Sequence, residues 1–87
     1  MIIVVNHRIS NPQDFWASAQ ANLPNLPEAG VTRVLQVMPN SDMTEATCVW
    51  EASDIPTLDN YLRGKVQDWS EDSFMEVNMA NAMGMPA

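Results

Sequence analysis

His7 is the one histidine in this chain of 87 residues, and histidine is the side chain best suited to proton transfer near neutral pH. It follows the apolar run 2–5, which predicts a strand, and it is in phase with Ile3 and Val5. The three side chains are therefore expected on one face of that strand. If this face lines the inside of a barrel, His7 would lie in a semi-enclosed cavity and could act as an acid, a base or a metal ligand. The alternative is that His7, at the end of the strand, only forms a hydrogen bond with a neighbouring residue.

Cysteine and aromatic side chains form a second group of candidates. Cys48 is in phase with Trp50 on a predicted strand, so the two should share a face. A nucleophilic cysteine needs a polarising neighbour, which no spacing in this sequence guarantees, and a buried structural thiol is the alternative. Trp50 and Tyr61 could form the walls of a pocket for a planar small molecule. Trp69, isolated in a polar segment, could contact a partner or cover a cavity.

Two carboxylates complete the candidates. Glu51 ends one predicted strand and Glu76 lies in another, and both strands should flank the strand that carries His7. The three residues could therefore form a cluster of nitrogen and oxygen ligands for a transition metal. One histidine with two carboxylates is few ligands for zinc or nickel, and solvated carboxylates at strand edges are the alternative.

Six elements must position these side chains. The β-branched run at the start predicts a strand over residues 2–9. Asn11 followed by Pro12 is typical of a helix start, and an apolar stripe continues to Leu23, before Pro24. Alternating patterns predict strands over 31–38 and 44–52, and the short turn between them predicts an antiparallel hairpin.

The last third of the chain predicts a helix and a final strand. Ser53 or Asp54 is expected to cap the helix, whose apolar stripe reaches Val66. Residues 67–72 are polar apart from Trp69 and predict a connection. Residues 74–81 fit a strand or a helix, and a strand over their first half is favoured because the first strand needs a partner.

The order β-α-β-β-α-β predicts a single α+β domain over 1–87, with the ferredoxin-like arrangement and a loose tail at 83–87. Such a domain has a four-stranded antiparallel sheet with both helices on one face. The other face is bare, and 46% of the residues are hydrophobic. A second copy would cover that face, so we expect a homodimer.

Charge and composition exclude several classes of protein. The chain has 4 basic and 11 acidic residues, for a net charge of -7, so it has no basic face for nucleic acid or anionic membranes. One cysteine forms no internal disulfide. No stretch approaches the roughly 20 apolar residues of a membrane span, and the start has no charged segment typical of a signal peptide. We therefore expect a cytoplasmic protein.

Over its whole length the chain resembles the dimeric α+β-barrel superfamily, in which two ferredoxin-like sheets pack together. Cys48-Val-Trp-Glu-Ala-Ser-Asp and Phe74-Met-Glu-Val-Asn are similar to a Cys-Leu-x-Glu-Ala-Pro-Ser … Tyr-x-Glu-Val pattern of small uncharacterised bacterial proteins, some described as nickel-binding. His7 falls where that group has histidines. The chain departs from the group at Asn6 and at Tyr61-Leu62, where further histidines would stand.

Three functions follow as hypotheses. The first is a homodimeric barrel that binds a small ligand in its cavity without a cofactor, with His7 as acid or base. The resemblance implies cofactor-free monooxygenases or small isomerases for such a barrel. The second is a protein that binds nickel or another transition metal through His7 with Glu51 or Glu76. The third is a non-catalytic assembly module.

Overall fold

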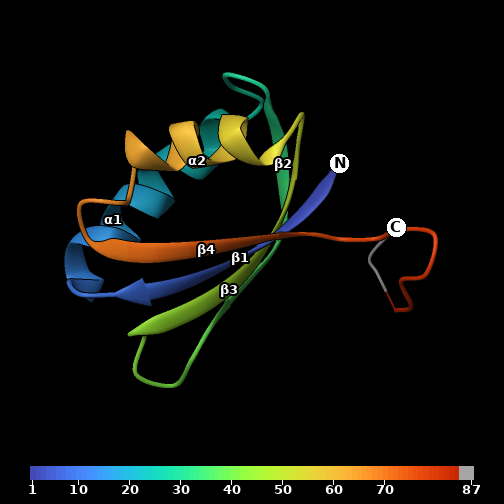
Figure 1. Cartoon of the computed structure of the whole chain (residues 1–87). Helices are drawn as coiled ribbons and strands as arrows, with labels where there is room; N and C mark the ends of the chain where they lie inside the picture. Colours follow the sequence, from blue (N-terminus) through green and yellow to red (C-terminus); the bar gives the residue numbers. More distant parts are fainter. Residues whose placement is uncertain (85–87) are drawn as a thin grey trace.

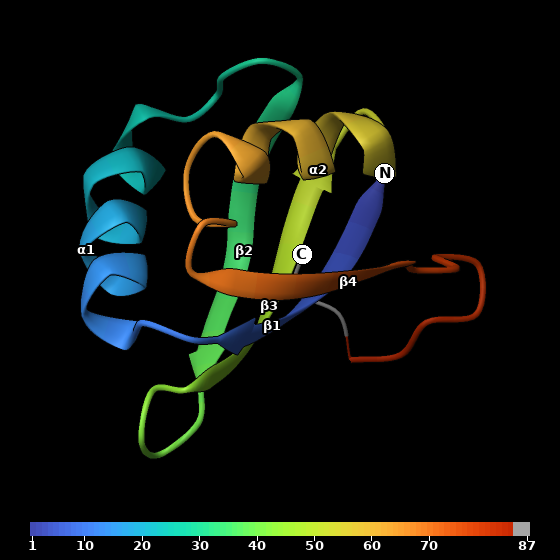
Figure 2. The ribbon, with the colours of Figure 1, turned by 60° about the vertical axis from the view of Figure 1, so that its left-hand side comes forward.

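Four strands and two helices make up the computed structural model, which describes residues 1–84 (Figure 1). The elements are β1 (Ile2–Ile9), α1 (Pro12–Asn22), the short 3-10 helix η1 (Leu23–Asn25), β2 (Val31–Pro39), β3 (Glu45–Ala52), α2 (Ile55–Arg63) and β4 (Ser70–Glu76). The strands form one antiparallel sheet in the order β2-β3-β1-β4. Figures 1 and 2 show both helices on the same side of it. The ferredoxin-like βαββαβ arrangement is therefore confirmed. Of the predicted tail, residues 85–87 lie outside the described residues.

Local sequence signals account for where the helices begin. The side chain of Asn11 accepts a hydrogen bond from the backbone N–H of Asp14, and Pro12 occupies the first turn of α1. At α2 the carboxylate of Asp54 accepts from the backbone N–H of Thr57 at 2.8 Å. Both caps satisfy N–H groups that have no partner inside the helix.

The core lies between the sheet and the helices. Ile3, Val5, His7 and Ile9 alternate along β1 and are all buried, so they occupy the face that the helices cover. Helix α2 contributes Leu58, Tyr61 and Leu62 to this core, whereas α1 buries only Phe15. Helix α1 is therefore the more loosely held of the two helices.

Strand β4 begins earlier than predicted. The expected strand started at Phe74, but β4 begins at Ser70 and pairs with β1 from Ile9, opposite Ser70, to Ile3, opposite Glu76. The N–H of Ser10 also donates to the carbonyl of Trp69 at 2.8 Å. As the edge strand beside β1, β4 tolerates polar residues that a central strand would exclude.

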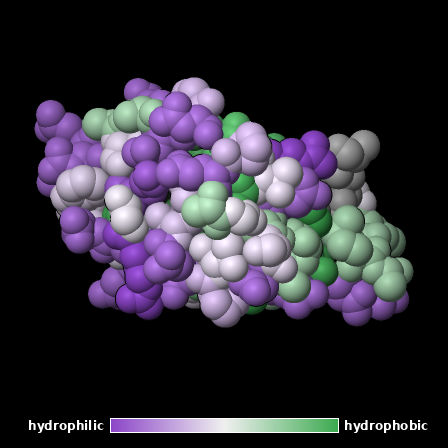
Figure 3. All heavy atoms as spheres, turned by 90° about the horizontal axis from the view of Figure 1, so that it is seen from above, coloured by the Kyte–Doolittle hydropathy of each residue, from purple (hydrophilic) through white to green (hydrophobic). Residues whose placement is uncertain are grey.

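Helix α2 is shorter than its apolar stripe indicated. It ends at Arg63 with Gly64 as its C-cap, while Val66 is buried from the turn that follows. Among residues 1–84, no helix combines the length and apolar character needed to cross a membrane. The outer surface over the helices is largely hydrophilic, with hydrophobic residues gathered toward one end of the molecule (Figure 3).

Candidate functional site

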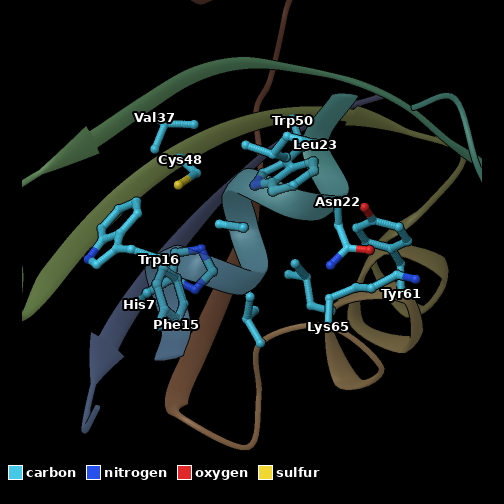
Figure 4. Close-up of a pocket in the computed structure, with 13 residues that line it drawn as sticks. His7, Phe15, Trp16, Asn22, Leu23, Val37, Cys48, Trp50, Tyr61 and Lys65 are labelled. Carbon is cyan, nitrogen blue, oxygen red and sulfur yellow. The ribbon is translucent and has the colours of Figure 1, made fainter. Parts of the chain in front are cut away.

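A cavity of about 30 Å³ lies between α1, α2 and the helix-covered face of the sheet (Figure 4). Its walls are mostly apolar and aromatic. They comprise His7, Phe15, Trp16, Ala19, Asn22, Leu23, Val37, Cys48, Trp50, Tyr61, Leu62, Lys65 and Val66. A space of this size holds about one or two water molecules.

The strand register brings the sheet residues of this cavity together. On the covered face, Val5 lies opposite Cys48, and Ile3 lies opposite Trp50. His7 is two residues further along β1 than Val5, so its ring reaches the same space as Cys48. Sequence phase alone had placed these side chains on two separate strand faces; the pairing of β1 with β3 makes them one wall.

His7 and Asp72 form a buried pair. The Nδ1 atom of His7 lies 2.6 Å from Oδ1 of Asp72, and each side chain is only 1% exposed. An ionised carboxylate only accepts hydrogen bonds, so next to ionised Asp72 a neutral His7 ring has its proton on Nδ1 and its free lone pair on Nε2. The hydroxyl of Ser70 also donates to Oδ1 of Asp72, at 2.7 Å, and Phe15 packs edge-on against the imidazole, with ring centroids 5.2 Å apart. Both contacts fix the orientation of the pair.

Three side chains of the cavity present polar atoms that have no hydrogen-bond partner among residues 1–84. These atoms are Nε2 of His7, Nε1 of Trp50 and the hydroxyl oxygen of Tyr61, all fully buried. An unpartnered buried polar group costs about 1–3 kcal/mol. Native proteins keep few such groups, and three around one cavity indicate a site that a polar occupant completes. Oδ2 of Asp72 is also buried without a partner, but Asp72 does not line the cavity.

The thiol of Cys48 is a neutral part of the wall. Burial raises the pKa of Cys48 to about 11, against a smaller opposite contribution from the backbone of Met38. Since the thiolate is the reactive form, Cys48 is not activated as a nucleophile. Of the two roles left open by the sequence, the structure favours the buried thiol.

Tyr61 and Lys65 lie at the far end of the cavity from His7 (Figure 4). Burial and the negative charge of Glu28 both raise the pKa of Tyr61, so its hydroxyl stays protonated and can donate. The Nζ atom of Lys65 lies 3.5 Å from Oε1 of Glu28 and 5.5 Å from the centroid of the Tyr61 ring. Its charge is therefore balanced by Glu28 and not free for an anion.

The carboxylates proposed as metal ligands do not join His7 within one chain. Glu51 pairs with Ile2 on the uncovered face and accepts from Nε of Arg33 at 3.0 Å. Glu76 is exposed and lies opposite Ile3, four residues along β1 from His7. Within residues 1–84, no group of three or more histidine, cysteine or acidic residues is placed to hold a metal ion.

Trp69 does not line the cavity either. It is half-buried and packs against the core, while its backbone carbonyl joins the start of β4 to Ser10. His7, Cys48, Trp50 and Tyr61 are thus brought together, and Trp69, Glu51 and Glu76 are not.

Asp72 is the important residue that the sequence prediction missed. It lies in the polar segment 67–72, which was expected to be a connection, and a carboxylate in a connection is usually solvated. A prediction that began the last strand at Ser70 would have placed Asp72 opposite His7. The signal was the length of β1, whose eight residues need a partner along their whole extent.

Comparisons with protein-family models, curated proteins and solved structures give no match to this chain. The site itself combines an oriented base, two unpartnered donors and an apolar enclosure. This combination is suited to binding a mainly apolar molecule and moving a proton on it.

Proposed function

We propose that this protein binds a small, uncharged, planar molecule in the cavity between its helices and its sheet, and that His7 removes a proton from it. The observation that carries this proposal is the state of the His7 ring. Nδ1 is held by buried Asp72 at 2.6 Å, while Nε2 is buried and unpartnered in the wall of the cavity. The ligand would lie inside one chain, rather than between two sheets as the sequence suggested.

The pair of His7 and Asp72 has the arrangement that a general base requires. The carboxylate selects the tautomer with the lone pair on Nε2 and holds the ring in place. When Nε2 takes a proton, the resulting imidazolium is stabilised by the adjacent carboxylate. Asp72 is accordingly a positioning residue, and His7 is the residue that would touch the ligand.

The cavity must widen to admit a ligand with a ring. About 30 Å³ is far below the roughly 150 Å³ that holds benzene in an engineered protein cavity. Helix α1 is the wall best able to move, because Phe15 is its only buried residue. Aromatic walls favour a flat molecule, and the balanced charge of Lys65 favours an uncharged one.

The resemblance implies two activities, an isomerase and a cofactor-free monooxygenase. Both begin with removal of a proton from the substrate. An isomerase returns the proton to a different atom of the same molecule. A cofactor-free monooxygenase instead lets the deprotonated substrate react with dioxygen. The geometry of His7 supports the shared step for either reaction.

The test uses 4-hydroxyacetophenone, whose phenolate absorbs at longer wavelength than its phenol. At a pH where the free probe is protonated, adding the protein is expected to produce the phenolate absorption. His7→Gln should abolish it, and Asp72→Asn should reduce it about tenfold or more, because the tautomer is no longer fixed. Glu76→Gln, an exposed carboxylate outside the cavity, is the matched control and should have no effect.

A second measurement needs no substitution. Nitrogen NMR of wild-type His7 should show a change at Nε2 on addition of the probe, with the bond from Nδ1 to Asp72 retained. Circular dichroism would establish that the His7→Gln variant is folded. Equal phenolate formation by folded His7→Gln and wild type would overturn the proposal. Oxygen uptake with the probe would identify the monooxygenase reaction.

A further inference from the structure

We infer that Tyr61 selects ligands that carry a conjugated carbonyl group at the end opposite their acidic group. This rests on the proposed function, because it concerns the ligand of the same cavity. The hydroxyl oxygen of Tyr61 is buried and has no hydrogen-bond partner in the described part of the chain, and the side chain lines the cavity from α2. His7 lines it from β1, and Figure 4 shows the two residues at opposite ends.

The Tyr61 ring is held in place by its neighbours. Trp50 packs edge-on against it, with centroids 6.1 Å apart, and the ammonium group of Lys65 lies 5.5 Å from its centroid. Burial keeps the phenol protonated, so a ligand atom opposite the hydroxyl would accept a hydrogen bond. Trp50 offers a second buried donor, Nε1, from the wall between the two ends (Figure 4).

A base at one end of the cavity and a hydrogen-bond donor at the other suit a ligand in which charge can move from one end to the other. When His7 removes a proton from a hydroxyl group, the O–H bond breaks, the proton bonds to Nε2, and the electron pair stays on the ligand oxygen. In a conjugated ring, that negative charge is shared with a carbonyl oxygen at the far end. The hydroxyl of Tyr61 would then donate to an oxygen whose charge grows as the proton leaves.

The charge balance of the cavity disfavours a carboxylate in place of the carbonyl. Lys65 is the cationic residue of the wall, and Glu28 lies 3.5 Å from its Nζ atom. A carboxylate moved from water into this apolar space would lose its hydration without gaining a free positive charge. The ligand class is therefore an uncharged, planar hydroxy-carbonyl compound.

The experiment compares two probes that differ only at the far end. In 4-ethylphenol a methylene group replaces the carbonyl of 4-hydroxyacetophenone, while the ring and the hydroxyl are the same. Calorimetry should show wild type binding 4-hydroxyacetophenone about tenfold more tightly, the value expected for one buried hydrogen bond. Tyr61→Phe should remove this preference and leave the affinity for 4-ethylphenol unchanged.

The control is Trp69→Phe, an aromatic substitution outside the cavity, which should keep the preference. Equal affinities in wild type would overturn the inference, as would a loss in Tyr61→Phe that is the same for both probes. Tighter binding of 4-hydroxybenzoate than of 4-hydroxyacetophenone would also overturn it.

Failure of this inference is distinguishable from failure of the proposed function. The preference between the probes should persist in His7→Gln, because it depends on Tyr61, whereas phenolate formation should be lost. A preference without phenolate formation in wild type would support the selection by Tyr61 and contradict the role of His7 as a base. Phenolate formation from both probes with equal affinity would contradict the inference alone.

Discussion

The chemistry available to His7 depends on Asp72, which lies 65 positions away in the sequence. Without that carboxylate, either nitrogen of the ring could carry the proton. With an ionised carboxylate there, Nδ1 of the neutral ring is the donor, and Nε2 is buried without a hydrogen-bond partner among residues 1–84. Ser70 adds a second hydrogen bond to the same oxygen of Asp72. The sequence identified the histidine; the role of its ring nitrogens comes from this pairing.

Cys48 provides a prediction on stability and pH. Its pKa is about 11 in the folded protein against an ordinary 9.0, so above pH 9 the unfolded chain loses the thiol proton first. The contribution of Cys48 to the free energy of unfolding is therefore unchanged below pH 9. It should fall by about 2 kcal/mol as the pH rises from 9 to 11. Urea unfolding at pH 7, 9 and 11 measures this change.

The matched control for this prediction is Cys48→Ala. Every other titratable group is the same in both proteins, so the difference between the two pH profiles isolates the thiol. A profile of wild type that runs parallel to that of Cys48→Ala would contradict the prediction.

At the scale of the elements, α1 is the less buried of the two helices that wall the cavity. It buries only Phe15, yet it supplies Phe15, Trp16, Ala19 and Asn22 to the cavity wall. The indole N–H of Trp16 donates to the carbonyl of Met43 at 3.0 Å, which ties α1 to the β2–β3 hairpin. Val37 also lines the cavity, from the edge strand β2, and is 36% exposed.

Trp16→Phe should loosen α1, because the substitution keeps an aromatic ring and removes the one N–H that binds the hairpin. The expected result is faster hydrogen exchange of α1 amides and faster association of 4-hydroxyacetophenone. The bond is exposed, so the stability should fall by only about 0.5–1 kcal/mol. Hydrogen-exchange mass spectrometry and stopped-flow fluorescence measure the first two effects, with Trp69→Phe as the control. Unchanged exchange in α1 would show that this hydrogen bond does not restrain the helix.

At the scale of the whole molecule, the helices cover one face of the sheet, and no helix within residues 1–84 covers the other face. The centre of the uncovered face is made by Val4, which is half-buried, and Val49, which is only 5% exposed, while Met75 beside them on β4 is 57% exposed. Arg33 and Glu51 form an ion pair beside this centre, so the charges there are already balanced. A two-fold rotation would place the apolar centre of one copy on that of another. We propose that a second copy of the chain covers this face.

The oligomeric state tests this proposal. Light scattering at micromolar concentration should give the mass of a dimer, and Met75→Lys should give a monomer, because it places a charge within the apolar interface. Met43→Lys changes an exposed methionine in the β2–β3 hairpin and should leave the dimer intact. A wild-type chain that scatters as a monomer would overturn the proposed interface.

The sequence by itself determined the elements and their order. Signals for these are local: the alternation of β1, the capping residues Asn11 and Asp54, and the short turn between β2 and β3. Right-handed crossovers then leave few arrangements for β-α-β-β-α-β. The sequence also made candidates of four residues that line the cavity, His7, Cys48, Trp50 and Tyr61, because rare residue types in phase on strands or helices are visible without coordinates.

Only the tertiary structure decided which of those residues lie next to one another and what encloses them. The start of β4 depends on hydrogen bonds to β1, so its position four residues earlier than predicted could not be read from the polar segment itself. That shift places Asp72 opposite His7 and supplies the carboxylate of the site. The packing of α1 and α2 on the same face encloses the cavity within one chain. Register and enclosure arise from contacts between residues far apart in the sequence, and local periodicity carries no information about them.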